Sequence, residues 1–386
     1  MYQIKLLNKI SAVGLNRFDS SKYSFGENPE QPVAVMVRSA SMHETVLDDS
    51  TLCVARAGAG VNNIPLDRFA KEGVVVFNTP GANANAVKEL VVAGMLLASR
   101  KILPAADWAK TLKGSGDETL KLVEKGKSQF VGPEILGKTL GIVGLGAIGI
   151  LVAQAAVALG MKVVGYDPYL SVNGAIRLPA DTKVVSDLDD LYKESDYITL
   201  HLPLNGETRG MVNGETIAKM RDGVRILNFA RDALVNDADM LAALESGKVA
   251  RYVTDFPTDA VIGVENVVAL PHLGASTPES EDNCAVMAAD EIMNYVENGN
   301  IINSVNMPRA EFGAVSAGVC RLCVICSSNA ETVSAVASVV CGAQRSATFT
   351  RNDYAYIMAD FASNADEIAE KARAVDGVIR ARVICG

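Results

Sequence analysis

The expected architecture rests on one segment, Thr139-Leu-Gly-Ile-Val-Gly-Leu-Gly-Ala-Ile-Gly149. Its last three glycines, Gly144, Gly146 and Gly149, form the pattern G-x-G-x-x-G, with an apolar, strand-like run before them and a helical pattern after them. In such a unit the first glycine permits the tight turn and the second lets the backbone approach a pyrophosphate. The third lets helix and strand pack closely. The segment therefore predicts a dinucleotide-binding βαβ unit.

The end of the next strand indicates which dinucleotide binds. The strand-like run from Met161 to Tyr166 is followed by Asp167. Its carboxylate can accept hydrogen bonds from both ribose hydroxyls and would repel the additional phosphate of NADP. Ala147 and Ile148 begin the helix, where free N–H groups and partial positive charge favour the phosphates. The sequence therefore predicts NAD as the cofactor.

The regions on both sides continue the alternation of strands and helices. Short apolar runs such as Ala34 to Val37 are separated by helical patterns, which is typical of doubly wound parallel sheets. We expect two such domains: a flavodoxin-like domain over residues 1–88, completed by residues 283–308, and a Rossmann domain over residues 89–282. The tail, residues 312–386, has the order βαββαβ of a small ferredoxin-like α+β domain. The expected fold class is therefore α/β with an appended α+β domain.

Composition and charge exclude several classes of protein. The chain has 386 residues, of which 49% are hydrophobic and 21% charged, which is typical of a globular protein with more than one core. Its net charge of −9 argues against nucleic acid or an anionic membrane as partner. Apolar runs such as Leu90 to Ala98 are too short to span a bilayer, and the N-terminus lacks the pattern of a signal peptide. We therefore expect a cytoplasmic protein.

The cysteines could suggest a metal cluster. The chain has seven of them, and this odd, scattered set suggests reduced thiols. Cys320, Cys323 and Cys326 form C-x-x-C-x-x-C, but Ala330 stands where an iron–sulfur run would need its fourth cysteine. The segment alternates like a strand, which would place Cys320 and Cys326 on one face and Cys323 on the other. We expect no metal site.

Several chemically useful side chains follow predicted strands. Arg231 and His272 come directly after strand-like runs, Asp255 and Asp259 follow another, and His201 follows a fourth. The carboxyl ends of parallel strands meet at one edge of a sheet, where ligands bind. Arginine can bind a carboxylate bidentately and polarise the adjacent carbonyl, and histidine can donate a proton to a keto group at neutral pH. A carboxylate beside His272 would orient its ring and raise its pKa, whereas a purely structural role also fits His201.

These residues stand in motifs that resemble the D-isomer-specific 2-hydroxyacid dehydrogenase family. The motifs are Arg38-Ser-Ala40, Ala55-Arg-Ala-Gly-Ala-Gly-Val-Asn-Asn63, Asn78-Thr-Pro-Gly81, the G-x-G-x-x-G pattern, Asn228-x-Ala-Arg231 and Pro271-His-Leu-Gly-Ala-Ser-Thr277. The resemblance implies that Arg231 holds the substrate carboxylate and that His272 exchanges a proton with the substrate oxygen. The family's supporting acid is usually Glu, and its position corresponds to Asp259, which is one methylene shorter. Asp255 is the alternative for that role.

The resemblance also implies the contacts with NAD. The family aspartate that contacts the nicotinamide carboxamide corresponds to Asp255, or to Thr254 in an alignment without gaps. The expected NAD-binding residues are Gly144, Gly146, Ala147, Ile148, Gly149, Asp167, His201, Phe229, Ala230, Asp255, Gly274 and Ala275.

The first domain is expected to select the substrate. Charged side chains and backbone N–H groups suited to a phosphate gather in two of its motifs. They are Arg38, Ser39, Arg56, Gly58, Ala59 and Gly60. The resemblance implies a phosphorylated 2-hydroxy or 2-keto acid, with oxidation of 3-phospho-D-glycerate as the expected reaction. The alternatives are a hydroxypyruvate or glyoxylate reductase, an erythronate-4-phosphate dehydrogenase and, more remotely, an NAD(H)-sensing corepressor-like binding protein.

The tail resembles the small-molecule-sensing ACT module. That module usually carries an Asn-x-Pro-Gly-like turn after its first strand, where this chain has Cys326-Ser-Ser-Asn-Ala-Glu331. The difference argues against serine binding at this turn. We expect the tail and the helix from Ala86 to Leu97 to support a homodimer or homotetramer.

Overall fold

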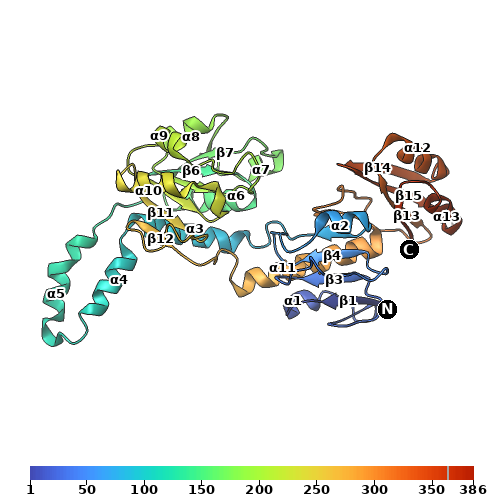
Figure 1. Ribbon diagram of the computed structural model, residues 1–386, viewed down its shortest axis with the longest axis horizontal. Helices are drawn as coiled ribbons and strands as arrows, with labels where there is room; N and C mark the ends of the chain where they lie inside the picture. Colours follow the sequence, from blue (N-terminus) through green and yellow to red (C-terminus); the bar gives the residue numbers. More distant parts are fainter. Residues whose placement is uncertain (363–364) are drawn as a thin grey trace. The chain divides into compact units, whose positions relative to one another are not determined.

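The structure is a computed structural model that describes residues 1–362 and 365–386 (Figure 1). It comprises two units, Met1–Asn83 with Pro278–Gly386, and Ala84–Thr277. These divisions fall slightly before the boundaries expected at residues 88 and 282, and the tail is grouped with the first unit. In the part of the chain that the structure describes, no helix combines the length and apolar character needed to cross a bilayer.

The second unit is built on a seven-stranded parallel sheet with the order β12-β11-β10-β9-β6-β7-β8. This is the expected Rossmann arrangement, in which the strand order reverses between β6 and β9, the position where such sheets bind their ligands. The strands are β6 Thr139–Val143, β7 Lys162–Tyr166, β8 Lys183–Val185, β9 Tyr197–Leu200, β10 Val224–Asn228, β11 Val249–Thr254 and β12 Val267–Ala269. The helices beside the sheet are α3 Ala84–Ser99, α6 Ala147–Ala158, α7 Val172–Arg177, α8 Leu188–Glu194, α9 Gly214–Lys219 and α10 Asp237–Glu245.

Two hydrophobic cores cover the faces of this sheet. Leu227 of β10 and Val253 of β11 belong to the core that includes apolar residues of α3 and α6. Their neighbours Ile226 and Tyr252 belong to the core that includes residues of α8, α9 and α10. Successive strand residues therefore point to opposite faces and both faces are buried, as in parallel sheets covered by helices.

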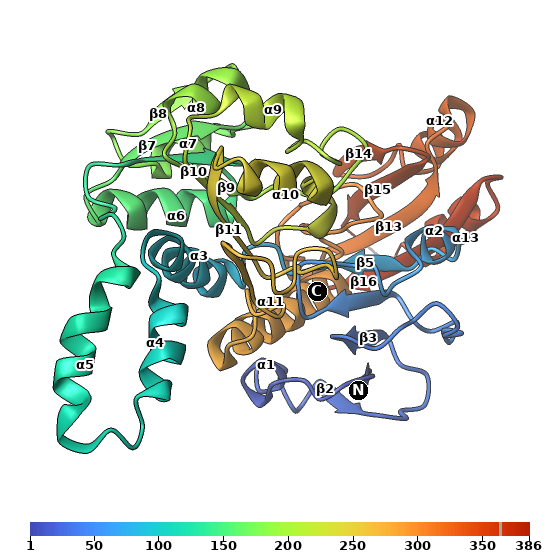
Figure 2. The ribbon, with the colours of Figure 1, turned by 60° about the vertical axis from the view of Figure 1, so that its left-hand side comes forward.

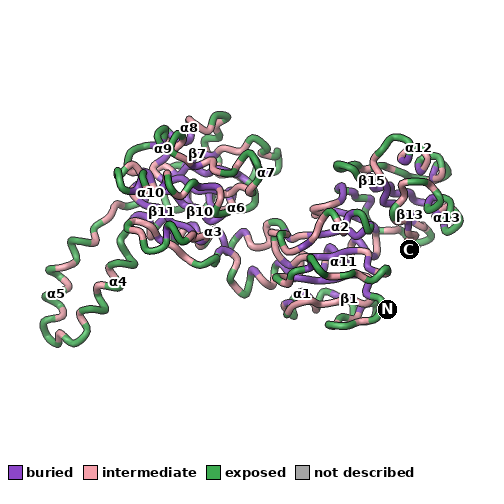
Figure 3. The backbone as a smooth tube through the Cα atoms, in the orientation of Figure 1, coloured by how far each residue is buried: buried purple, intermediate pink, exposed green. Residues whose placement is uncertain are grey.

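A helical arm extends from this unit (Figure 2). It consists of α4 Ile102–Thr111 and α5 Thr119–Gly126, with 3₁₀ turns at Gly116–Glu118 and Lys127–Phe130. Both helices are fully described, and neither contains a buried residue (Figure 3). The sequence patterns did not predict this arm.

The first unit contains a five-stranded parallel sheet with the order β2-β1-β3-β4-β5, which is the expected flavodoxin-like arrangement. Its elements are β1 Tyr2–Leu6, α1 Ala12–Leu15, β2 Tyr23–Gly26, β3 Ala34–Val37, β4 Cys53–Arg56, α2 Leu66–Lys71, β5 Val75–Phe77 and the long helix α11 Pro278–Asn298. Helix α11 packs on α1 and β4. It approaches α1 so closely that a Cβ atom on Gly14 would lie 2.4 Å from Ala285, so this contact requires glycine.

The tail has the expected βαββαβ order and forms an antiparallel sheet, β14-β15-β13-β16. Its elements are β13 Cys320–Ser327, α12 Ala330–Val339, β14 Arg345–Arg351, β15 Tyr354–Phe361, α13 Asp366–Arg373 and β16 Val378–Cys385. Helices α12 and α13 cover one face of the sheet, where Cys326 is buried. The other face, with Cys323 and Tyr356, joins the core that contains Tyr295 of α11. The expected placement of Cys323 and Cys326 on opposite faces is therefore confirmed.

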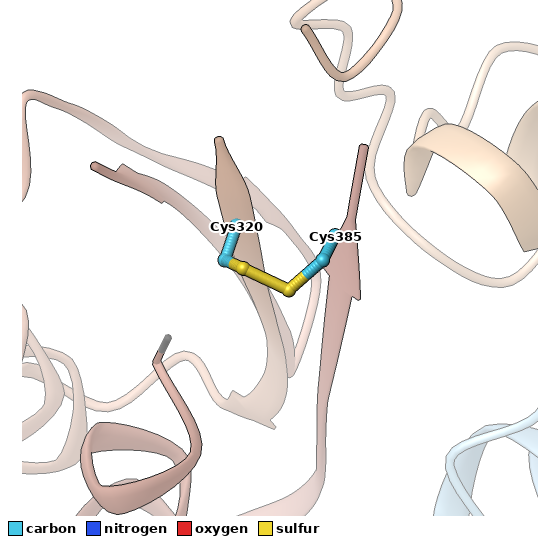
Figure 4. Close-up of a disulfide and its surroundings, with 2 residues drawn as sticks. All are labelled: Cys320 and Cys385. Atoms are coloured by element: carbon cyan, nitrogen blue, oxygen red, sulfur yellow. A yellow bond between two sulfur atoms is a disulfide. The ribbon is translucent and has the colours of Figure 1, made fainter. Parts of the chain in front are cut away.

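The expectation that all cysteines are reduced thiols is wrong. Cys320, the first residue of β13, and Cys385, the last residue of β16, form a disulfide (Figure 4). The two residues are partners in the antiparallel register, with Cα atoms 4.1 Å apart. Composition could not indicate this pair because the residues are 65 positions apart and meet only through the strand register.

Two arginines of the tail bind the end of α11. Arg382 donates hydrogen bonds to the carbonyl oxygens of Tyr295 and Val296, and its guanidinium lies 4.4 Å from the centre of the Tyr295 ring. Arg321 donates to the Asn298 carbonyl oxygen at 2.8 Å and pairs with Asp360. The last carbonyls of a helix lack partners within the helix and carry partial negative charge. The tail therefore caps α11.

Candidate active site

The glycine turn after β6 has the shape that a dinucleotide requires. Gly144 has a φ of +98°, and a Cβ atom there would lie 2.4 Å from the His201 carbonyl oxygen. A Cβ on Gly149 would lie 2.0 Å from the Gly144 carbonyl oxygen. Gly146 is exposed, and a Cβ there would meet no atom of the described chain within 4 Å. The outer glycines thus shape the turn, while Gly146 leaves open the space that a pyrophosphate needs.

Asp167 lies beside this turn, directly after β7. Its Oδ2 accepts a hydrogen bond from the Leu145 N–H at 2.9 Å, and its Oδ1 accepts one from the Tyr169 N–H at 2.8 Å. Each carboxylate oxygen keeps a further lone pair for a ribose hydroxyl. Helix α6 begins at Ala147, so the N–H groups of Ala147 and Ile148 have no partner within the helix and can bind phosphate.

His201 follows β9 and is electrically neutral in this setting. Its ring nitrogen Nε2 lies 3.0 Å from the Thr199 hydroxyl, and its buried Nδ1 has no hydrogen-bond partner among the described residues. Burial lowers the pKa of His201 to about 3. The imidazole is therefore neutral near pH 7 and is not an imidazolium that could protonate a substrate, and a contact with the cofactor remains its expected role.

The loop after β10 is held by the buried Asn228. Its side-chain amide donates to the Arg231 carbonyl oxygen at 2.8 Å, and its Oδ1 accepts from the Ala230 N–H at 3.2 Å. The Phe229 ring points into the core, where a Cβ on Gly94 would lie 2.7 Å from it. Phe229 can therefore offer its backbone to a cofactor, whereas the Arg231 side chain is exposed.

Arg231 and His272 meet the same aromatic ring. The Phe256 ring centre lies 4.3 Å from that of His272, and the Arg231 guanidinium carbon lies 5.7 Å from the Phe256 ring centre. These three residues follow β10, β11 and β12, so the carboxyl edge of the sheet brings them together. The sequence patterns gave Phe256 no role. The only available signal was an aromatic residue directly after Asp255 at a strand end.

Asp255 is the carboxylate that holds the loop of His272. It is 1% exposed, and its Oδ2 accepts a hydrogen bond from the Gly274 N–H at 2.9 Å. Burial raises the pKa of Asp255, and the Gly274 hydrogen bond and the nearby His272 oppose this rise. A Cβ on Gly274 would lie 3.2 Å from Asp255 Oδ2, so glycine permits the loop to approach this carboxylate closely. Ala275 is the next residue of the loop.

Asp259, unlike Asp255, is not buried beside the loop of His272. It is exposed in the turn after β11, and over residues 1–362 and 365–386 no hydrogen bond or ion pair joins it to His272. The neighbouring Thr258 donates to Asp237 at the start of α10, at 2.6 Å. Of the two acids considered for support of His272, Asp255 is the one connected to its loop.

The first unit presents two arginines at the ends of adjacent strands. The backbone N–H groups of Arg38, Ser39 and Ala40 all donate to Asn8 Oδ1, at 3.0, 3.1 and 3.0 Å. These N–H groups are therefore already occupied. The Arg38 side chain, which is half-exposed, pairs with Glu281 of α11.

Arg56 lies over the glycine loop that follows β4. Its Nε donates to the Arg38 carbonyl oxygen at 3.1 Å. Gly58 has a φ of +155°, which residues with a side chain rarely adopt, and a Cβ there would lie 2.5 Å from an Arg56 guanidinium nitrogen. Asn78 donates to the Ala59 carbonyl oxygen at 2.6 Å and holds the loop that ends at Gly60. Arg38 and Arg56 thus stand beside one turn.

Comparison of sequences shows extensive similarity to dehydrogenases. Residues 92–274 match the family model "D-isomer specific 2-hydroxyacid dehydrogenase, NAD binding domain", which agrees with the expected cofactor. The chain is 36% identical over 284 residues to the D-3-phosphoglycerate dehydrogenase of Bacillus subtilis, covering 71% of this chain and 51% of that protein. It is 37% identical over 275 residues to the hydroxypyruvate reductase of Thermotoga maritima, covering 68% and 84%. The chain spans about half the length of the D-3-phosphoglycerate dehydrogenases that it matches.

Solved structures of a reductase and a dehydrogenase are also similar to this chain. A glyoxylate reductase from Paecilomyes thermophila is similar with a TM-score of 0.64 and 27% identity, covering 79% of this chain and 98% of that one. The NAD+-bound 3-phosphoglycerate dehydrogenase of Entamoeba histolytica is similar with a TM-score of 0.60 and 26% identity, covering 79% and 98%.

Proposed function

We propose that this chain, which belongs to the D-isomer-specific 2-hydroxyacid dehydrogenase family, oxidises 3-phospho-D-glycerate to 3-phosphohydroxypyruvate with NAD. This reaction opens L-serine biosynthesis. The observation that carries the choice of substrate is the pair Arg38 and Arg56 at adjacent strand ends, beside the Gly58–Gly60 turn. Two guanidinium groups can bind a phosphate through several charge-assisted hydrogen bonds.

The residues of the second unit supply the chemistry. When bound, NAD accepts the hydride that leaves C2 of the substrate. Arg231 binds the substrate carboxylate bidentately, and His272 accepts the hydroxyl proton during oxidation and returns it during reduction. Asp255 positions the loop of His272 through Gly274. His201 is neutral and serves the cofactor rather than the proton transfer.

A hydroxypyruvate reductase is the second candidate function. The relative from Thermotoga maritima carries that name, and this chain covers 84% of its length. The ion pair between Arg38 and Glu281 also favours this candidate, because an arginine already paired with a carboxylate is less available to a phosphate. Arg38, Arg56 and Glu281 therefore decide between a phosphorylated and an unphosphorylated substrate.

Steady-state oxidation of NADH tests the proposal directly. Phosphohydroxypyruvate, hydroxypyruvate and glyoxylate are compared with the same enzyme, and kcat/KM is expected to be highest for the phosphorylated acid. Arg56→Gln should reduce this value for phosphohydroxypyruvate only, by roughly tenfold or more, because it removes charge-assisted hydrogen bonds to the phosphate. Arg17→Gln, which removes an exposed arginine of the same unit, is the matched control. Equal or better rates with the unphosphorylated acids would reject the phosphorylated substrate.

We infer that the chain forms a homodimer through the second unit. The arm exposes apolar side chains in the absence of a partner, among them Leu120 at 78% and Ile102 at 47% exposure. Exposed apolar patches of this kind are typical of protein interfaces. Light scattering of the wild type and of Leu120→Glu tests this: the substitution should shift a dimer towards monomer, and a wild-type monomer would refute the inference.

A further inference from the structure

The ion pair between Arg38 and Glu281 lies where the substrate phosphate is proposed to bind. Arg38 follows β3, whereas Glu281 belongs to the first turn of α11. In the described residues, Glu281 is the only side chain to which the Arg38 guanidinium donates a hydrogen bond. Their side chains are 43% and 42% exposed, so a ligand can reach both.

Helix α11 packs on β4, the strand that ends at Arg56, and its first turn carries the partner of Arg38. One turn after Glu281, burial raises the pKa of Cys284, and the charges of Arg56 and Arg38 both oppose this rise. A helix N-terminus attracts anions, but the first turn of α11 already carries Glu279 and Glu281. The anionic position nearest to Arg38 is thus filled by the protein itself.

We propose that Glu281 competes with the substrate phosphate for Arg38 and occupies this arginine until the phosphate displaces it. This inference rests on the proposed function, in which Arg38 binds that phosphate. A phosphate monoester carries about −1.5 to −2 charges near neutral pH and three acceptor oxygens, so it competes well against a single carboxylate. An anion with a single charge would gain little binding free energy by displacing Glu281 from Arg38. Glu281 thereby raises the KM for the phosphorylated substrate without preventing its binding.

The experiment measures KM and kcat of Glu281→Gln for phosphohydroxypyruvate and for hydroxypyruvate. Without the competing carboxylate, KM for phosphohydroxypyruvate should fall about two- to fivefold, the size expected for a half-exposed charge pair. The values of kcat, and of KM for hydroxypyruvate, should stay unchanged. Glu279→Gln is the matched control because it removes the same charge from the same exposed turn. In an Arg38→Gln background, Glu281→Gln should have no effect on KM.

The outcomes separate this inference from the proposed function. If the wild type does not prefer phosphohydroxypyruvate, the proposed function fails and this inference fails with it. If the wild type prefers it but Glu281→Gln behaves like Glu279→Gln, only the role of Glu281 is overturned. An equal change of KM for both substrates, or the same change in the Arg38→Gln background, also overturns it, since either result would indicate a general structural effect. Thermal unfolding of each variant verifies that the fold is intact.

Discussion

We call the candidate cofactor region of the second unit the cofactor half and the candidate substrate region of the first unit the substrate half, and the two are held by different kinds of interaction. In the second unit the cofactor half is shaped by backbone: Gly144 and Gly149 cannot carry a side chain, and Gly146 faces open space. In the first unit the substrate half is shaped by side-chain partners from distant parts of the chain, such as Asn8 and Glu281 around Arg38.

The difference matters because the two kinds of interaction leave different traces in a sequence. A turn that requires positive φ or close backbone contact has few solutions, and glycine is the main one. A charged side chain has many possible partners, and only the tertiary structure selects among them. The cofactor half should therefore respond to changes of shape, and the substrate half to changes of charge.

The largest effect is expected at His272, the side chain of the second unit that is proposed to transfer the proton. His272→Asn should lower kcat by about 10²- to 10⁴-fold, the contribution typical of a positioned general acid or base. Because His272 is exposed, the melting temperature should not change. The exposed His43 of the first unit offers a matched control, His43→Asn. If kcat of His272→Asn falls less than tenfold, a residue other than His272 must transfer the proton.

A buried acid of α11 provides a test of charge in the first unit. Glu291 is 8% exposed, its Oε1 accepts from the Asn303 amide at 2.6 Å, and its Oε2 has no partner within the described chain. Burial raises the pKa of Glu291 from 4.5 to about 8. Between these two values the folded chain retains a proton that the unfolded chain releases. The free energy of unfolding should therefore fall as pH rises through this window, by the order of a few kcal/mol.

Urea unfolding near both ends of that window measures this dependence. Glu291→Gln should lose most of the decrease between about pH 5 and about pH 8. Glu245→Gln, at an exposed position of α10, should retain it. If the wild type and Glu291→Gln show the same pH dependence, Glu291 does not keep its proton in the folded chain.

A change of shape in the cofactor half should have a smaller effect, and on binding alone. Gly146→Val adds a side chain where no protein atom of the described residues lies within 4 Å, so the fold should persist. The Kd for NADH, measured by fluorescence titration, should rise roughly ten- to a hundredfold, which is about 1.4–2.7 kcal/mol. Gly342→Val, at an exposed tail position with equal space, should bind NADH normally. Unchanged NADH affinity in Gly146→Val would show that the pyrophosphate does not approach this turn.

Most strands and helices could be predicted because their patterns are local. The runs Ala34 to Val37, Val224 to Asn228 and Tyr354 to Phe361 coincide with β3, β10 and β15, since buried strands show continuous apolar residues. The arm of α4 and α5 was missed because neither helix buries a residue in the chain itself, and an unburied helix has no packing face to reveal it.

Contacts between distant residues could not be predicted in the same way. Cys320 and Cys385 meet through strand register, and the bond between Asp255 and Gly274 depends on the course of a loop. The sequence indicated that Arg231 and His272 lie at one edge of a sheet, because strand ends meet there. It could not indicate that Phe256 lies against both, since that depends on how three loops pack.

Phe256 tests whether the cofactor half depends on backbone shape alone, because this residue contacts its neighbours through its side chain. Its ring contacts His272 and Arg231, and stacking and cation–π contacts of this kind contribute about 0.5–1.5 kcal/mol. Phe256→Leu should therefore lower kcat/KM by about three- to tenfold while the Kd for NADH stays the same. Phe25→Leu, which alters an exposed aromatic residue of the first unit, should change neither value. A loss in NADH affinity equal to the loss in kcat/KM would mean that Phe256 supports the fold around the cofactor. A loss in kcat/KM alone would mean that it positions Arg231 and His272, so that the cofactor half also depends on one contact between distant side chains.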